Sequence, residues 1–350
     1  MKTIYVVDDN NVNLTKAKRV LEGHYRVLTI PSAGRMFELI VKIIPDLILL
    51  DIDMPEMDGF TALKKLNESG HTQRIPVIFL TASTDDDIEA QGFKLGAVDF
   101  ITKPFSPSVL MNRIETHLNI NELIQKRTAK IEQLKNGIVS VMADLVESRD
   151  EITGGHIDRT TMYLKIMIGA MEEKGIYADE MKDWDTAVAI SSARLHDVGK
   201  VKITDLILNK PGKLTPDEFN AMRRHAVEGE KIIGQIVAKT GEESFLSHAK
   251  LFAGHHHERW DGKGYPRGMK EREIPLQGRI MAIADVYDAL ISERPYKKAF
   301  THEESVKIIA EGGGSQFDPV LAELFLGVSD EFYKAALCNA TLEAETGDKI

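Results

Sequence analysis

Five short apolar runs in the first 118 residues constrain the fold of this chain more than any other feature. They are rich in β-branched residues and lie at 3–7, 25–30, 46–50, 76–81 and 99–102. Amphipathic stretches suited to helices separate them, and strands that alternate with helices form a parallel sheet. The sequence therefore predicts an α/β, doubly wound fold with a five-stranded parallel sheet for residues 1–118.

Polar side chains follow the predicted strands at their carboxyl ends, which is where such sheets bind ligands. Asp8 and Asp9 follow the first run, Asp51 follows the third, Thr81 closes the fourth and Lys103 follows the fifth. Carboxylates gathered at one edge repel each other unless a hard cation such as Mg²⁺ lies among them. A hydroxyl and an ammonium beside them suit a phosphoryl group. Capping of strand ends is the alternative, but it does not explain so coordinated a set.

The segments "VVDD", "LLDIDMPEMDG", "LTA" and "TKPF" resemble, in this order, the motifs of the receiver domain of a two-component response regulator. The resemblance implies a flavodoxin-like fold and a cognate sensor histidine kinase as partner. It implies that Asp51 is the phosphoacceptor. It also implies that Asp8, Asp9, Asp51 and the backbone carbonyl of Asp53 hold Mg²⁺.

The same resemblance assigns the residues that respond to phosphorylation. Thr81 and Lys103 would contact the phosphoryl group, and Phe100 would be the switch aromatic. The Lys103–Pro104 peptide bond would be cis. Regulation by phosphorylation of Asp51 follows as an expectation, with its sign left open.

Residues 119–148 carry a heptad repeat of apolar residues, interrupted once by Arg127. Its two rows are Ile124, Ile131, Ile138 and Leu145, and Ile120, Leu134 and Val141. Such a repeat favours a long helix that pairs with a partner as a coiled coil, which would make the chain a homodimer. The alternative is an ordinary amphipathic helix that lies on its own domain.

Residues 149–327 have a mostly helical pattern, and several histidines and aspartates stand in or beside its apolar runs. These are His156, His196, Asp197, His225, His256, His257 and Asp285. One such residue alone is more often a satisfied core group, but seven together indicate a metal site, since unpaired polar groups in apolar surroundings are costly. Imidazole with carboxylate suits Mn²⁺, Fe²⁺, Zn²⁺ or Ni²⁺, and the lack of thiolates weakens a structural-zinc interpretation. The number of ligands predicts two or more ions, with Asp197 bridging them from the same helical turn as His196.

The motif "HDVGK" followed by "HHERWDGKGYP" resembles the HD-GYP domain, an all-α HD-superfamily fold of metal-dependent cyclic di-GMP phosphodiesterases. The resemblance implies that the seven residues above are metal ligands and that His255, which precedes the family's His-His-Glu, is not. Family members with three metals have a glutamate four residues before the first histidine, where this chain has Ile152. Glu151 is adjacent but would point about 100° away on a helix. We therefore expect two ions, with iron or manganese favoured.

The implied reaction is attack on one phosphodiester of cyclic di-GMP by a hydroxide that bridges the two metals, giving pGpG and, with a second cut, GMP. Lys200, four residues after His196 on the same predicted helical face, would neutralise developing charge or protonate the leaving oxygen. Arg294 and Lys297 would hold the other phosphate, or would form a solvated surface cluster.

The triplet Gly264, Tyr265 and Pro266 could be only a tight turn with an aromatic lid. The resemblance adds two uses, shaping the pocket and docking diguanylate cyclases of the GGDEF type. Two other functions remain open for this half. It could bind cyclic di-GMP or a partner without turnover, or it could hydrolyse another nucleotide.

Composition excludes several classes of protein. The formal net charge of −10 argues against general binding to DNA or to anionic membranes. No apolar run approaches the roughly 18 residues that span a bilayer, and the start "MKTIYVVDDN" lacks the features of a signal peptide. A single cysteine, Cys338, fits a reducing cytosol, so we expect a cytoplasmic protein without membrane insertion. Residues 328–350 are expected to form a helix that frays into solvent.

Overall fold

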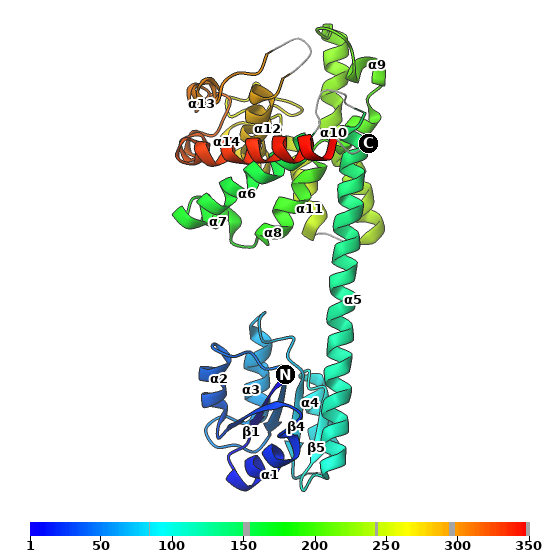
Figure 1. The fold of residues 1–350 in the computed structure, drawn as a ribbon, viewed down its shortest axis with the longest axis vertical. Coiled ribbons are helices and arrows are strands. Elements are labelled where there is room, and N and C mark those ends of the chain that lie inside the picture. Colours follow the sequence, from blue (N-terminus) through cyan, green and yellow to red (C-terminus); the bar gives the residue numbers. More distant parts are fainter. Residues whose placement is uncertain (84, 150–154, 242–243, 294–297, 348–350) are drawn as a thin grey trace. The chain divides into compact units, whose positions relative to one another are not determined.

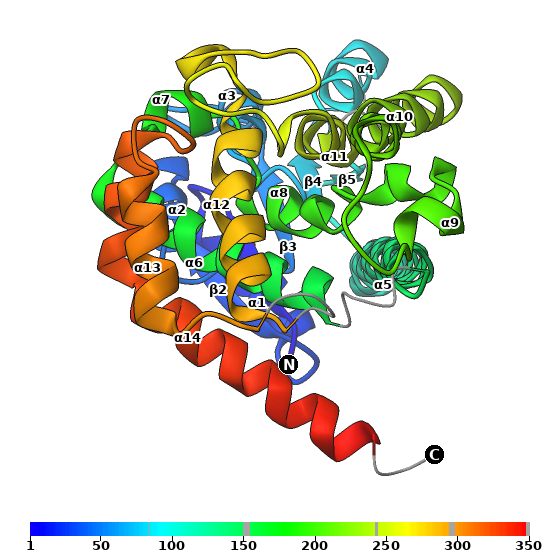
Figure 2. The same cartoon turned by 90° about the horizontal axis from the view of Figure 1, so that it is seen from above.

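The computed structural model describes residues 1–83, 85–149, 155–241, 244–293 and 298–347, with the side chains of 339–347 excepted. The chain forms two compact units, Met1–Glu132 and Gln133–Ile350. Figures 1 and 2 show a unit built around a sheet and a unit built from helices. This confirms the predicted fold class of an α/β domain followed by an all-α domain.

The first unit contains a five-stranded sheet in which all neighbouring strands are parallel. The order is β2-β1-β3-β4-β5, with β1 at Thr3–Val7, β2 at Arg26–Ile30, β3 at Leu47–Asp51, β4 at Val77–Thr81 and β5 at Asp99–Thr102. Each strand lies within one residue of its predicted run. The runs of β1, β3 and β4 are buried along their whole length and form the centre of the domain, whereas the edge strands β2 and β5 are partly exposed.

Alternate residues of each strand face opposite sides of the sheet, and each side has its own hydrophobic core. Phe79 of β4 lies in one core and Leu80 in the other. The helices α2, α3 and α4 pack on the Phe79 side, and α1 and the start of α5 pack on the Leu80 side. Their bounds are Asn11–Leu21 for α1, Ala33–Ile40 for α2, Gly59–Glu68 for α3, Asp86–Lys94 for α4 and Pro107–Glu147 for α5.

Helix α5 is continuous from the receiver-like unit into the helical unit, so the division predicted at 118/119 falls inside it. Leu110, Ile114 and Leu118 near its start are buried in the Leu80 core. Val139 and Val146 near its end are buried in a core of the second unit. One helix therefore contributes to the hydrophobic cores of both units.

The heptad residues of α5 are exposed rather than packed on their own domain. Between 47% and 65% of their surface is accessible, for Ile120, Ile124, Ile131, Leu134, Ile138, Val141 and Leu145. Val139, Ala143 and Val146, which are not heptad positions, supply the buried face instead. The end of α5 thus packs on its own unit and still presents an apolar row to solvent.

The second unit consists of helices around two hydrophobic cores. Its α-helices are α6 (His156–Lys174), α7 (Ala178–Met181), α8 (Thr186–Ser192), α9 (Asp205–Leu208), α10 (Pro216–Thr240), α11 (Ser244–His255), α12 (Leu276–Ile291), α13 (His302–Glu311) and α14 (Pro319–Gly347). Among the described residues, short 3₁₀ helices also occur: η1 (Ala193–Leu195), η2 (Val198–Lys202) and η3 (Glu271–Glu273).

The larger core lies among α6, α12, α13 and α14, and the smaller one lies among the end of α5, η1, η2, α10 and α11. The tail predicted from residue 328 begins inside α14, whose Phe332 is fully buried against Tyr163 at a ring-centroid distance of 4.6 Å. In the described part of the chain, no helix has both the length and the apolar character needed to cross a membrane.

Candidate metal centres and an adjoining pocket

Two groups of potential metal ligands lie in the helical unit, within the ranges that the structure describes. One consists of His156, His196 and Asp285, and the other of His225, His256 and His257. In each group the donor atoms lie within 4.8 Å of one another. The structure therefore brings together six residues that are separated by up to 129 positions in the sequence.

Five segments of the chain supply these side chains, and one of them is the turn between η1 and η2 that carries His196. His156 begins α6, His225 lies on α10, and Asp285 lies on α12. His256 and His257 directly follow α11. These elements also contribute to the two hydrophobic cores of the unit, and α11 contributes to both. The four histidines His156, His196, His225 and His256 are between 0% and 6% exposed.

Asp197 lies between the two ligand groups. Its Oδ2 atom is 3.6 Å from Nε2 of His196 in the first group. Its Oδ1 atom is 3.5 Å from Nε2 of His225 and 3.7 Å from Nε2 of His256 in the second group. Each oxygen of this carboxylate therefore faces a different group, which is the arrangement of a bridging ligand.

The helical geometry predicted around His196 is wrong. His196 and Asp197 form a turn between the two 3₁₀ helices η1 and η2, and not part of an α-helix. In a 3₁₀ helix the side chains at i and i+3 are eclipsed, so Lys200 stands beside Asp197 instead of sharing a face with His196. The Lys200 Nζ atom is 2.8 Å from Oδ2 of Asp197.

Gly199 explains why this segment can approach α10 so closely. A Cβ atom at this position would lie 1.9 Å from the carbonyl oxygen of His225 and 2.5 Å from the amide nitrogen of Gly229. Only glycine allows such an approach between backbones. The contact places Asp197 next to His225, so the glycine of "HDVGK" contributes to the geometry of the bridge.

The histidines direct their Nε2 atoms toward one another. His196, His225 and His256 each place Nδ1 within 3.0 Å of a backbone carbonyl, of Ala193, Met222 and Phe252 respectively. A nitrogen that donates to a carbonyl leaves the other nitrogen unprotonated and free to bind a metal. The Nε2 atoms of His225 and His256 are 3.3 Å apart, as are those of His156 and His196. Facing lone pairs of this kind fit a shared cation.

The electrostatics keep four of the histidines and Asp197 in the protonation state that binds metal. Burial lowers the pKa of His196, His256 and His257, and it lowers that of His225 to about 4. Burial by itself would raise the pKa of Asp197, but Lys200 and the histidines hold the pKa well below its usual value. Neutral imidazoles around an ionised carboxylate are the donor set expected of a site for a transition-metal ion.

Asp288 and Arg159 support His156, and both were missed by the sequence analysis. Asp288 accepts a hydrogen bond from Nδ1 of His156 at 2.8 Å and is itself held by Arg159 at 2.7 Å. Burial would lower the pKa of His156, but this hydrogen bond and the nearby carboxylates raise it. A carboxylate that orients a histidine in this way increases its strength as a metal ligand. The signal was present, because Asp288 stands one turn after Asp285 in an apolar helix.

Glu147, the last residue of α5, was also missed. Its Oε1 atom accepts a hydrogen bond from the backbone amide of His156 at 2.7 Å. The residue before α6, Gly155, has no side chain to cap the helix, so Glu147 takes that role from another helix. The connecting helix thus ends in direct contact with a candidate metal ligand.

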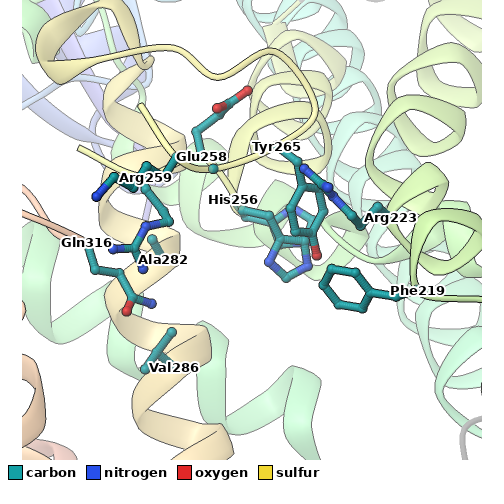
Figure 3. A pocket seen from close by; sticks show the side chains of 12 residues that line it. Phe219, Arg223, His256, Glu258, Arg259, Tyr265, Ala282, Val286 and Gln316 are labelled. Atoms are coloured by element: carbon teal, nitrogen blue, oxygen red, sulfur yellow. The ribbon is translucent and has the colours of Figure 1, made fainter. Parts of the chain in front are cut away.

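A pocket of about 300 Å³ opens beside the second ligand group. Figure 3 shows one wall formed by Phe219, Arg223 and Tyr265, with Arg259 and Gln316 across the opening. The ring of Tyr265 lies 4.6 Å from that of His257, between centroids, so the aromatic wall adjoins the candidate metal ligands. This arrangement supports the interpretation of "GYP" as a motif that shapes the pocket.

Gly264 and Pro266 complete the turn that carries Tyr265. A Cβ atom on Gly264 would lie 2.3 Å from the amide nitrogen of Arg259, so this position requires glycine, and the Tyr265–Pro266 bond is cis. Within the same loop, Glu258 is 3% exposed and accepts backbone hydrogen bonds from Arg267 and Met269. Glycine, proline and a buried carboxylate therefore determine the path of this loop.

Several predicted residues lie away from the site or outside the described residues. His255 hydrogen-bonds through Nδ1 to the carbonyl of Leu251 and belongs to neither ligand group. Arg294 and Lys297, proposed to hold phosphate, lie outside the described residues, as do Ile152 and Glu151, on which the expected metal count depends.

A third ligand group lies in the first unit at the carboxyl edge of the sheet. It consists of Asp8, Asp9 and Asp51, and Lys103 reaches it with Nζ at 2.8 Å from Asp8 and 2.7 Å from Asp51. The pKa of Asp51 is raised, mainly by burial. The hydrogen bond from Lys103 lowers this pKa, and the negative charge of Asp8 raises it further. Asn13, not singled out from the sequence, donates to both oxygens of Asp8 at 3.1 Å.

The other predicted residues of this site lie around the carboxylates. Thr81 is buried at the end of β4, and its hydroxyl accepts a hydrogen bond from the amide of Ser83 at 3.0 Å. Phe100 is buried and packs on Phe79. Asp53 is exposed just beyond β3. The Lys103–Pro104 bond is cis, as predicted.

Comparison with known proteins agrees with this division. The family model described as "Response regulator receiver domain" matches residues 4–115, and the one described as "HD domain" matches residues 140–321. The chain is 40% identical to a "Probable cyclic di-GMP phosphodiesterase" of Vibrio cholerae serotype O1, over 95% of this chain and 79% of that protein.

Two further relatives differ in their named roles. The "Cyclic di-GMP phosphodiesterase response regulator RpfG" of Xanthomonas campestris pv. campestris is 32% identical, over 92% of this chain and 86% of that protein. A "3'3'-cGAMP-specific phosphodiesterase 2" of Vibrio cholerae serotype O1 is 38% identical, over 62% of this chain and 38% of that protein. The matches confirm both resemblances indicated by the sequence motifs: the chain belongs to the HD-domain family and joins that domain to a response-regulator receiver domain.

Proposed function

We propose that this chain is a response regulator whose HD domain hydrolyses cyclic di-GMP to pGpG. The observation that carries the proposal is the position of Asp197, with one oxygen toward each of two histidine-rich ligand groups. Relatives that the chain covers over most of their length are named as a probable cyclic di-GMP phosphodiesterase and as a cyclic di-GMP phosphodiesterase response regulator. Further hydrolysis to GMP is compatible with the same site.

His156, His196 and Asp285 would hold one metal ion, His225, His256 and His257 the other, and Asp197 would bridge them. Two bound ions, with iron or manganese favoured by the donors, would supply a hydroxide nucleophile near neutral pH and neutralise charge on the phosphoryl oxygens. Lys200 contacts Asp197 at 2.8 Å, and its ammonium group would neutralise the charge that develops on the leaving oxygen. Arg294 and Lys297 remain our candidates for holding the second phosphate.

The receiver domain would control this reaction through Asp51, phosphorylated by a cognate histidine kinase with Mg²⁺ held by Asp8, Asp9 and Asp51. A phosphoryl group adds roughly 1.5 to 2 negative charges, and its direct effect is local. The route we propose is α5, which ends at Glu147 on the backbone of His156. A shift of this helix would therefore alter the position of a metal ligand.

Product analysis tests the proposed function. The purified chain, loaded anaerobically with Fe²⁺ or Mn²⁺, should convert cyclic di-GMP to pGpG, while a His196→Ala/Asp197→Ala variant should form none above background. Chromatography of the nucleotides measures both. Absence of product with every metal, with and without phosphorylation of Asp51, would contradict the catalytic function.

The two alternatives make different predictions in that experiment. A binding module would bind cyclic di-GMP and return it unchanged. An enzyme for another substrate would cleave a different cyclic dinucleotide, and the relative named for 3′3′-cGAMP makes this the second candidate. Docking of GGDEF-type partners on the Gly264–Pro266 turn is a separate prediction, which pull-down with purified partners addresses.

We also propose that the chain forms a homodimer through the heptad row of α5. Seven apolar side chains between 47% and 65% exposed, at coiled-coil spacing, would be covered by the same row of a second copy. The interruption at Arg127 costs stability at one layer and can help to specify the register.

An Ile131→Lys/Ile138→Lys variant should be a monomer at concentrations where the wild type is a dimer. Each dimer would lose four buried isoleucines, so its Kd should rise by at least about 10³-fold. Analytical ultracentrifugation measures the change. Asn136→Lys, which adds charge to the same helix outside the heptad rows, is the control and should leave the dimer intact. A double variant that stays dimeric would refute the interface.

A further inference from the structure

The pocket beside the second ligand group contains an arginine to which no role has been given. Arg223 lies on α10, two residues before the candidate ligand His225, and is half-buried in the pocket wall. Its guanidinium carbon is 4.4 Å from the centre of the Tyr265 ring and 5.8 Å from that of Phe219 (Figure 3). These contacts hold the guanidinium group against the aromatic wall of the pocket.

The nearby arginines are engaged by carboxylates. Arg259 pairs with Asp261 at 2.9 Å, and Arg224 has Glu228 at 3.8 Å. Among the described residues, none offers Arg223 a carboxylate within ion-pair distance. A cation held by aromatic rings makes no hydrogen bond to them along its N–H edge, so the donors of Arg223 remain available to a ligand in the pocket.

The pocket has the size and lining of a subsite for one nucleobase. Its volume of about 300 Å³ is at the lower end for small-molecule sites, so it suits one part of a cyclic dinucleotide. Phe219 is 48% exposed at this pocket and offers a flat apolar face on which a base can stack. Tyr265 adjoins His257, which places this subsite next to the candidate metal centres.

We propose that Phe219 and Arg223 form a guanine-reading subsite, in which Arg223 donates two hydrogen bonds to O6 and N7 of one guanine of cyclic di-GMP. This inference rests on the proposed function and specifies its substrate preference. Guanine presents two acceptors on that edge, matching the two donors of a guanidinium fork. Adenine presents an acceptor and an amino donor, so one arginine donor would face another donor. The residue would therefore select guanine over adenine.

The test is an Arg223→Lys variant, because lysine keeps the charge but cannot donate the two parallel hydrogen bonds. We expect kcat/KM for cyclic di-GMP to fall by about 10- to 100-fold, the cost of losing one bidentate base contact. The value for cyclic di-AMP should change much less, so the preference for guanine should shrink by a similar factor. Arg224→Lys, on the exposed side of α10, is the matched control and should change neither value.

Each outcome is informative. An equal loss of kcat/KM for both dinucleotides would show that Arg223 contacts phosphate and would overturn the reading of the base. Any other result in which the preference for guanine is unchanged would overturn it as well. Metal content measured for each variant separates a damaged metal site from a changed specificity. If the wild type binds cyclic di-GMP without cleaving it, calorimetric affinities for the two dinucleotides take the place of kcat/KM. The catalytic proposal would then fail while the guanine subsite is still tested.

Discussion

Replacing Asp197 by asparagine should lower kcat/KM for cyclic di-GMP by at least about 10³-fold and reduce the metal content of the protein. The carboxylate directs Oδ1 to His225 and His256 and Oδ2 to His196 and Lys200. The asparagine side chain keeps one acceptor oxygen, which can face only one of the two ligand groups. Its NH₂ group faces the other ligand group, which therefore loses the oxygen that Asp197 provides. Metal sites of this kind contribute several kcal/mol to the stabilisation of the transition state, which sets the size of the loss.

The measurement pairs elemental analysis of metal per chain with product analysis. Asp183→Asn is the control, because the side chain of Asp183 is 86% exposed and lies outside both ligand groups. The control should keep wild-type metal content and activity. If Asp197→Asn retains both ions and full turnover, the bridging role is wrong, even if the histidines prove to be ligands.

Replacing Asp51 by asparagine should abolish incorporation of a phosphoryl group into the chain. Asp51 is 4% exposed, it lies within 4.8 Å of Asp8 and Asp9 through their oxygens, and Lys103 contacts it at 2.7 Å. The amide is a poor nucleophile and removes one negative charge from the candidate Mg²⁺ site. Incubation with acetyl phosphate and Mg²⁺, followed by intact-protein mass spectrometry, measures the loss.

The neighbouring Asp53 provides a close control for this experiment. It is expected to act through its backbone carbonyl, and its side chain is exposed, so Asp53→Asn should still be phosphorylated. Phosphorylation of the Asp51→Asn variant at wild-type level would place the acceptor elsewhere. Loss in the Asp53→Asn variant would show that its carboxylate, and not only its backbone, contributes to the site.

The receiver site was predictable because strand patterns and chain connectivity are local properties. Short apolar runs rich in β-branched residues identified the strands to within one residue, and parallel strands bring their carboxyl ends to one edge of a sheet. The approach of Asp8, Asp51 and Lys103 follows from that topology. The hydrogen bonds from Asn13 to Asp8 could not be predicted from the topology, because they depend on the direction of a side chain on α1.

The geometry of the HD site was less predictable. The sequence suggested an α-helical turn at His196, but the structure has a 3₁₀ helix on each side of the His196–Asp197 turn. Gly199 of the second 3₁₀ helix lies close to α10, and Lys200 stands beside Asp197. The contact between His156 and Asp288 joins residues 132 positions apart. No local pattern specifies such a contact, since it depends on how α6 and α12 pack.

The sequence alone determined the fold class, the two functional halves and the chemical identity of the candidate metal ligands. Donor chemistry belongs to residue types, and hydrophobic periodicity specifies the elements that carry them. Only the tertiary structure decided how these donors are arranged: which oxygen of Asp197 faces which histidine group, and which pocket Arg223 lines. Those features depend on the packing of helices that are distant in the chain, where a displacement of about 1 Å makes or breaks a contact.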